Sequence, residues 1–232
     1  MFYLMFNNKK NTDLGIKIVK RPSIPTPVRE KNTITIAGKG SFATFTGGYD
    51  DIEISVQFNL IERKFSLKEV FRYVKAWLYN IKDNKLTFSD DADYYYKVKD
   101  VAIDDFEVAL RRKGTFTVKF TCYPFTYLHE GDIQREIANN TVLFNQFGID
   151  AKPLIYLEAA GEVTISINES TFKINVDKYA YIDSDLELAY KEKTDLFNLL
   201  EGDYPVLKDG ENTISYSSNV SKFEIQPRWR CL

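Results

Sequence analysis

Histidine and cysteine are nearly absent from this sequence of 232 residues, which has one histidine and two cysteines. The histidine, His129, directly follows a predicted strand, where we expect a surface or linker residue, and no Gly-x-Ser-x-Gly elbow precedes a helix. Cys122 and Cys231 match no zinc-ligand or thioredoxin-like spacing and imply no disulfide framework. The sequence therefore predicts no catalytic, metal-binding or cofactor-binding residues, and hence a protein that is not an enzyme.

Long apolar runs are missing as well. Nowhere do about 18 apolar residues follow one another, as a membrane-spanning helix requires. Residues 1–8 have no basic leader and no small-residue cleavage site. We therefore expect neither a secretion signal nor membrane insertion.

Positive charge is not in excess, because 31 Lys and Arg residues face 33 Asp and Glu residues, for a net charge of −2. Such a chain offers phosphate backbones no general attraction, so we expect no specific nucleic-acid binding. A local basic strip near the start is interpreted as solvated surface, with a polyanion site as the alternative: Lys9, Lys10, Lys17, Lys20 and Arg21.

The sequence is instead rich in β-strand patterning, and 44% of its residues are hydrophobic, enough for a folded core. Apolar and polar residues alternate over 52–60 and again over 116–122, which predicts two half-buried strands that could be neighbours in one sheet. Residues 101–110 are predicted as one further strand. Between the first two, Ser66 and Glu69 predict a capping box for one amphipathic helix, whose apolar residues are Leu67, Val70, Phe71, Val74, Trp77 and Leu78.

Proline residues and changes of pattern divide the chain. Prolines at positions 22, 25 and 27 predict an exposed, extended connection. After Pro124 the alternation stops, and short strands resume near Asp150. We predict a mainly β fold of the β-rich α+β type: residues 1–128 form a β-barrel-like or sheet domain with one packed helix, residues 129–150 form a linker, and residues 151–232 form an antiparallel β-sandwich.

Three kinds of motif resemble binding chemistry, and each has a plainer interpretation. The acidic clusters Asp90-Asp91-Asp93 and Asp104-Asp105 lack the calcium-loop pattern and suit turns, with calcium ligation or paired catalytic carboxylates as alternatives. The glycines of Gly38-Lys39-Gly40 and Gly47-Gly48 lack the strand-to-helix context of a phosphate loop. Successive residues of Tyr94-Tyr95-Tyr96 face opposite sides of a strand, so we expect core and interface packing rather than one stacking platform.

Several short motifs follow one another in a recognisable order. The first half contains Ala37–Gly40, the strand from Ile52, Trp77-Leu78, Leu86–Asp90, Asp93–Tyr96 and the block Gly114–Pro124. The second half contains Pro153–Ile155, Gly161, Ile165–Asn168, Tyr181–Ser184, Gly202–Leu207, Gly210–Asn212 and Pro227–Trp229. Over nearly the whole chain, this order resembles the distal tail protein family of phages with long, non-contractile tails. Lys39 departs from the pattern, since family members often have Arg at that position.

The resemblance implies a ring-forming N-terminal domain and a galectin-like C-terminal β-sandwich. It implies a homo-oligomeric ring, a hexamer, that acts as a baseplate hub and lets DNA pass. The implied partners are the tail tube protein, a tail-tip or tail-associated lysin-type protein and a receptor-binding protein. The implied location is the phage tail tip of the virion, after synthesis in the host cytoplasm.

Two questions stay open at the level of the sequence. No residue can be assigned to the oligomer interface, although the segment of residues 22–27 and the sheet edges are candidates. The alternative function is a carbohydrate-binding module for host cell-wall polysaccharide, for which Tyr179, Tyr181 and Trp229 are the candidate exposed aromatic residues.

Overall fold

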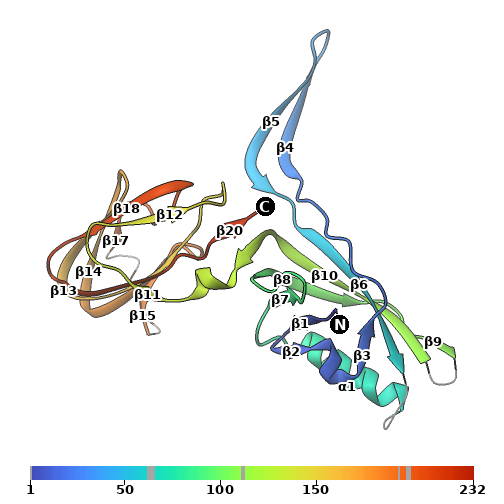
Figure 1. Cartoon of the computed structure of the whole chain (residues 1–232). Coiled ribbons are helices and arrows are strands. Elements are labelled where there is room, and N and C mark those ends of the chain that lie inside the picture. The colour runs from blue at the N-terminus through green and yellow to red at the C-terminus, as the bar shows by residue number, and fades with distance from the viewer. Residues whose placement is uncertain (1, 62–65, 111–112, 193, 197–199) are drawn as a thin grey trace. The chain divides into compact units, whose positions relative to one another are not determined.

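The computed structural model describes residues 2–61, 66–110, 113–192, 194–196 and 200–232 (Figure 1). The chain divides into two compact units, Met1–Thr126 with Leu232 (unit 1) and Tyr127–Cys231 (unit 2). Each unit has a hydrophobic core of its own. The predicted mainly β fold with one packed helix and a β-sandwich is confirmed.

Unit 1 is a curled antiparallel sheet with one helix and a separate two-stranded ribbon. The hydrogen-bonded order along the sheet is β2-β1-β7-β8-β10-β6-β3, and β9 also pairs with β10. The elements are β1 (Leu4–Phe6), β2 (Lys9–Lys10), the 3-10 helix η1 (Asn11–Leu14), β3 (Ile16–Ile18), β4 (Arg29–Ile36), β5 (Gly40–Tyr49), β6 (Ile52–Ile61), α1 (Leu67–Tyr79), β7 (Lys85–Phe88), β8 (Tyr94–Ile103), β9 (Glu107–Leu110) and β10 (Lys113–Leu128).

The two strictly alternating segments are neighbours, as predicted. Strands β6 and β10 pair antiparallel, with Val56 opposite Val118 and Phe58 opposite Phe116. The side chains of one face are buried, because every second residue of each strand points into the core of unit 1.

Helix α1 begins at the predicted capping box. The Ser66 hydroxyl accepts the backbone N–H of Glu69, and the Glu69 carboxylate accepts the backbone N–H of Ser66. These hydrogen bonds lower the pKa of Glu69. On the buried face, the Trp77 indole N–H donates to the carbonyl of Phe6 (2.8 Å), which ties the helix to β1.

The strand predicted over residues 101–110 is interrupted. Its first residues continue β8 as far as Ile103, and β9 begins at Glu107. Asp104 lies in the break, where its N–H donates to the Thr117 carbonyl and its carboxylate lies 3.3 Å from the Lys119 ammonium. Acidic turn residues therefore end a strand that the apolar pattern alone would continue.

Unit 2 is an antiparallel sandwich built on one long hairpin. Its described elements are η2 (His129–Asp132), β11 (Arg135–Glu136), β12 (Thr141–Asn145), β13 (Leu154–Ile167), β14 (Ser170–Asp183), β15 (Leu188–Lys191), β16 (Thr194–Asp195), β17 (Leu200–Glu201), β18 (Gly210–Tyr216), β19 (Val220–Gln226) and β20 (Arg230–Cys231). The main order is β11-β19-β13-β14-β15-β16, while β18 joins β12 and β13. Strands β13 and β14 pair along their whole length, from Leu154 opposite Asp183 to Ile167 opposite Ser170, and are longer than the short strands expected after Asp150.

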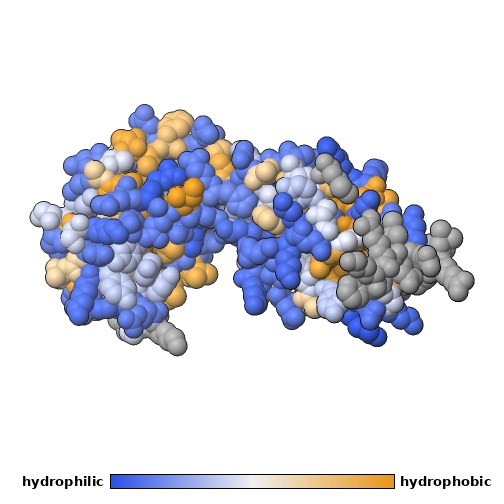
Figure 2. Space-filling view, turned by 60° about the horizontal axis from the view of Figure 1, so that its bottom comes forward, coloured by the Kyte–Doolittle hydropathy of each residue, from blue (hydrophilic) through white to orange (hydrophobic). Residues whose placement is uncertain are grey.

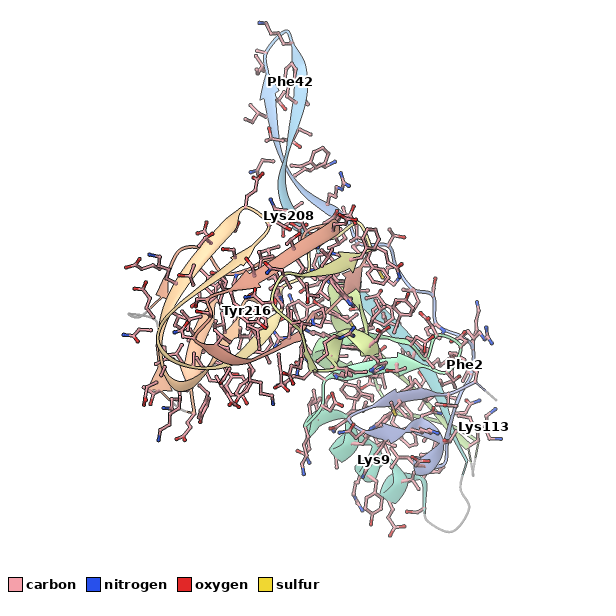
Figure 3. All side chains as sticks on the ribbon, turned by 60° about the vertical axis from the view of Figure 1, so that its left-hand side comes forward. Phe2, Lys9, Phe42, Lys113, Lys208 and Tyr216 are labelled. Atoms are coloured by element: carbon pink, nitrogen blue, oxygen red, sulfur yellow. The ribbon has the colours of Figure 1, made fainter. Side chains whose placement is uncertain are left out.

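Residues 129–150, predicted as a linker, supply two strands and a core residue to unit 2. Strand β11 pairs with β19, and β12 pairs with β18. Ile137 is buried, its N–H donates to the Phe223 carbonyl, and its own carbonyl accepts the Tyr216 hydroxyl (3.0 Å). Asn139 bonds both the N–H and the carbonyl of Tyr216, which is labelled in Figure 3. These short strands show no long alternation, so the sequence pattern does not reveal them.

The two cysteines are not joined in a disulfide. Cys122 is fully buried among the core residues of unit 1, and burial, together with the nearby charge of Asp51, raises the pKa of its thiol to about 12. Such a thiol is a packing residue rather than a nucleophile. Among the described residues, no helix has the length and apolarity needed to cross a membrane.

Candidate assembly surface

Strands β4 and β5 form a hairpin that pairs with no third strand among the described residues. The glycine-rich motif makes its turn: Gly38 has φ +79°, and the N–H of Lys39 donates to the carbonyl of Ile36 (3.0 Å). In the register that follows, Thr35 lies opposite Ser41, and their hydroxyl groups hydrogen-bond at 3.1 Å. The predicted glycine turn is thus present, and it closes a two-stranded ribbon.

One face of this hairpin is apolar and exposed. Ile34 lies directly opposite Phe42, and Ile36 lies two residues further along the same face. Their exposed fractions are 60% for Ile34, 54% for Phe42 and 46% for Ile36. Figure 3 shows Phe42 on the hairpin ribbon. We call Ile34, Ile36 and Phe42 the hairpin face.

The opposite face of the hairpin is more polar and includes Lys31, Thr33, Thr35 and Ser41, with one exposed aromatic residue, Phe45, opposite Lys31. At the base of the hairpin, the N–H of Asp50 donates to the carbonyl of Val28. The ring of Tyr49 meets that of Phe125 on β10 edge-on at 5.8 Å, which ties the base of the ribbon to the main sheet of unit 1. Within the ribbon, the Arg29 guanidinium lies 5.9 Å from the Tyr49 ring centre.

The hairpin face differs from the ordinary surface of the molecule. On the face seen in Figure 2, hydrophobic residues form small patches among hydrophilic ones. Isolated exposed apolar residues of that kind are normal, whereas an isolated two-stranded hairpin is marginally stable in water. The exposed backbone edges and the apolar side chains of β4–β5 are therefore suited to burial against a partner.

A second distinctive surface lies on the outer face of unit 2. Tyr190, Tyr181 and Tyr156 occupy directly paired positions on β15, β14 and β13, and Tyr179 is two residues away on β14. Ring centres are 5.3 Å apart for Tyr181 and Tyr190 and 5.0 Å apart for Tyr156 and Tyr181. We call these four side chains the tyrosine row.

Charged groups surround the tyrosine row. The Tyr156 hydroxyl donates to the Glu158 carboxylate (2.7 Å), and this hydrogen bond, with burial, raises the pKa of Tyr156 to about 12. Burial, aided by nearby Glu192, also raises the pKa of Tyr179. Lys222 lies 5.7 Å from the Tyr156 ring centre and pairs with Glu224, which raises the pKa of Lys222 and lowers that of Glu224. The hydroxyl groups of Tyr156 and Tyr179 therefore remain neutral donors at physiological pH.

The acidic clusters lie in turns of unit 1. The N–H of Asp91 donates to the carbonyl of Phe88, and the Asp90 carboxylate pairs with Arg21 at 3.0 Å. Burial, with the charges of Asp90 and Asp93, raises the pKa of Asp91. Within the part of the chain that the structure describes, no group of three or more His, Cys, Asp or Glu side chains could hold a metal ion.

The other residues singled out in the sequence are not brought together. His129 begins η2 in unit 2, far along the chain from both acidic clusters. Tyr95 is buried, and Tyr96 packs on the opposite side of the strand against Phe88, so the triple tyrosine divides between two faces as expected. The residues of the basic strip are distributed over β2, β3 and the following loop.

One expectation about the aromatic residues is wrong. Trp229 is only 7% exposed and belongs to the core of unit 2, because position 229 falls on the inward side of the alternation that begins in β19. Tyr179 and Tyr181 do lie on the outer face. Sequence reasoning missed their partners Tyr156 and Tyr190, since cross-strand register decides which tyrosines meet.

The comparisons with known proteins agree with these features. The family described as phage tail protein RIFT-related domain matches residues 9–122. The crystal structure of SPP1 Dit (gp 19.1), described as a paradigm of the hub adsorption apparatus in phages that infect Gram-positive bacteria, is similar over 100% of both chains, with a TM-score of 0.70 and 18% sequence identity. At this identity the likeness concerns the fold. No curated protein gives a significant match.

The family match covers the helix, both alternating strands and the β4–β5 hairpin. The structural match extends the likeness through unit 2. The resemblance to phage tail proteins that the ordered motifs predict is therefore confirmed, and residues 9–122 match the family described as phage tail protein RIFT-related domain.

Proposed function

We propose that this chain is a structural subunit of the phage tail tip that forms a ring-shaped hub, a homohexamer, from copies of itself. The observation that carries the proposal is the hairpin face, whose apolar side chains are exposed on a ribbon that, among the residues the structure describes, pairs with no third strand. A neighbouring copy can cover this face and pair with the hairpin edges. The family match and the fold of a hub protein support the same assignment.

The hub would join the tail tube protein to the baseplate parts, a tail-tip or lysin-type protein and a receptor-binding protein, and let DNA pass through the ring. A net charge of −2 supports a conduit, because strongly basic walls would hold phosphates. In this role the chain needs no catalytic group, and host attachment would depend on its surfaces.

Oligomeric state tests the proposal most directly. Light scattering after size-exclusion chromatography, with negative-stain images, should reveal a ring for the unmodified full chain. The double variant Ile34→Ser, Phe42→Ser removes the apolar contacts. Because a fully buried side chain of this size contributes about 1.5–3 kcal/mol, we expect each subunit contact to weaken by at least about 100-fold.

A matched control uses the other side of the same ribbon. The double variant Lys31→Ala, Thr33→Ala changes two exposed side chains opposite the hairpin face and should leave the ring intact. Two results together would contradict the proposal: the purified chain stays monomeric at every accessible concentration, and virions assemble tails without this protein. Equal loss of the ring in both double variants would show that the hairpin face is not the contact.

A further inference from the structure

The tyrosine row has a composition that the hub role does not explain. Its four rings lie on the outer face of three adjacent strands, whereas the side chains that alternate with them fill the core of unit 2. The exposed large aliphatic residues of unit 2 among the described positions all lie outside β13, β14, β15 and β19. Apolar contact at this face therefore comes mainly from the tyrosine rings.

Polar groups occupy the next positions in register. Tyr156 is followed across the sheet by Glu224 on β19 and Glu136 on β11, while Tyr179 is followed by Glu158 and Lys222. Each aromatic ring of the row therefore has a hydroxyl, carboxylate or ammonium group one or two strands away. Neighbouring strands are roughly 5 Å apart.

We infer that the tyrosine row and its charged neighbours form a binding site for a neutral oligosaccharide. A sugar presents C–H faces and hydroxyl groups side by side, which matches rings that are bordered by hydrogen-bonding groups. A protein partner fits less well, because the cores of protein interfaces are depleted in Lys and Glu, and these residues border Tyr156 and Tyr179.

The charged side chains around the tyrosine row indicate whether a bound sugar should be neutral or anionic. The carboxylates that touch or flank the rings are Glu136, Glu158, Asp183, Glu192 and Glu224, and the cationic groups are Lys191, Lys222 and Arg228. Carboxylates are in excess, so an anionic glycan would be repelled and a neutral one would not. The site also has little to reorganise on binding, because each phenol ring already packs against another ring.

This inference goes beyond the hub proposal and does not depend on it, since the site lies within unit 2 of one chain. The test titrates the full chain with maltotetraose, cellotetraose and chitotetraose up to about 10 mM, a range chosen because single sugar sites of this kind bind weakly, and uses tetragalacturonate as the anionic probe. We expect saturable binding of at least one neutral probe and binding of tetragalacturonate at least about fivefold weaker.

Variants separate the ring from its hydroxyl. Tyr181→Ala removes the central ring and should weaken binding of the neutral probe by about tenfold or more. Tyr181→Phe keeps the ring, and its affinity should stay within about threefold of that of the unmodified chain. Tyr73→Ala, an exposed tyrosine of α1 in unit 1, should change nothing. Thermal unfolding verifies that each variant is folded.

Three outcomes overturn the inference: no saturable binding of any neutral probe, equal binding of the anionic probe, or unchanged affinity in a folded Tyr181→Ala. Capture of a purified tail protein that depends on Tyr181, without sugar binding, would identify the row as a protein interface instead. A monomeric chain that still binds the sugar would contradict the hub proposal and leave this inference intact.

Discussion

Two antiparallel hairpins in this chain have similar local chemistry and different surroundings. In unit 2, β13 and β14 pair from Leu154 opposite Asp183 to Ile167 opposite Ser170, and one face is buried except at Gly161, Lys178 and Ser170. In unit 1, β4 and β5 also pair along their length, yet every described side chain of β4 is exposed. Burial, rather than pairing, distinguishes them.

The difference shows where a hairpin obtains its stability. Backbone pairing contributes little on its own, and the β13–β14 hairpin gains from apolar side chains that other strands cover. The β4–β5 hairpin has fewer apolar residues, and the structure of one chain leaves them uncovered. In the proposed ring, a neighbouring copy would supply the burial that this ribbon lacks within one chain, and the stability of the ribbon would then depend on assembly.

The largest predicted difference in stability between the two hairpins comes from removing one phenylalanine from each. Phe172 of β14 is 1% exposed, so Phe172→Ala should destabilise unit 2 by about 3–5 kcal/mol. Phe42→Ala in β5 should change the stability of the monomer by less than about 0.5 kcal/mol.

Each unit contains one of the two tryptophans, Trp77 and Trp229, so urea unfolding can be followed separately for each unit by 19F NMR of the 5-fluorotryptophan-labelled chain. The measurement belongs at a concentration at which the chain is monomeric. A comparable loss in both variants would mean that β4–β5 is part of a core.

The next prediction concerns the buried ion pair at the end of β14. Asp183 is 3% exposed and accepts two hydrogen bonds from the Arg228 guanidinium, at 2.7 and 2.9 Å. Arg228→Met leaves a buried carboxylate without its cation and should destabilise unit 2 by about 3 kcal/mol. Lys173→Met breaks an exposed pair on the same strand and should cost less than about 0.5 kcal/mol.

The same pair predicts a dependence on pH. Burial raises the pKa of Asp183, but the hydrogen bonds and charge of Arg228, with the N–H groups of Leu186 and Asp185, outweigh it and lower the pKa overall. A carboxyl whose pKa is lowered in the folded state stabilises the fold above its unfolded value of about 3.9. The contribution of Asp183 to the unfolding free energy of unit 2 should thus be complete near neutrality and decrease as the pH drops below 4. In the variant Arg228→Met, the unfolding free energy of unit 2 should decrease less over the same pH range.

The sequence alone predicts the parts of the fold that depend on local periodicity. The alternation at Ile52 and Phe116 predicts the β6–β10 pair, and Ser66 with Glu69 predicts the start of α1. The same logic fails between residues 129 and 150, because β11 and β12 are short and their partners come from the far end of the chain. Long-range pairing leaves no periodic signal in such short segments.

The candidate surfaces were harder to predict than the fold. The alternation of Ile34, Ile36 and Phe42 looks like that of a core strand, and only the absence of a covering layer in unit 1 reveals an exposed face. The tyrosine row depends on register, since Tyr156 and Tyr190 meet Tyr181 only after three strands have aligned. A single sequence contains neither the covering layer nor the register.

The smallest predicted effects come from substitutions in the turns of the β4–β5 and β13–β14 hairpins. Gly38 has φ +79°, where alanine costs roughly 1 kcal/mol, but Gly38→Ala should leave the unfolding of both units unchanged because the hairpin adds nothing to a core. Only the amides of β4 and β5 should exchange faster with deuterium. Asn168, at the β13–β14 turn, accepts the N–H of Thr213 and donates to Asn212.

Asn168→Gly keeps the backbone freedom that φ +56° requires and removes those two hydrogen bonds, so unit 2 should lose about 1 kcal/mol. Hydrogen exchange by mass spectrometry, on the monomeric chain, locates each effect. If Gly38→Ala lowered the unfolding midpoint of unit 1 as much as Asn168→Gly lowers that of unit 2, the two hairpins would be equally integrated into their units. The exposed residues of β4–β5 would then need another explanation than a partner, because a ribbon that shares in the cooperative unfolding of unit 1 is stabilised within the chain itself.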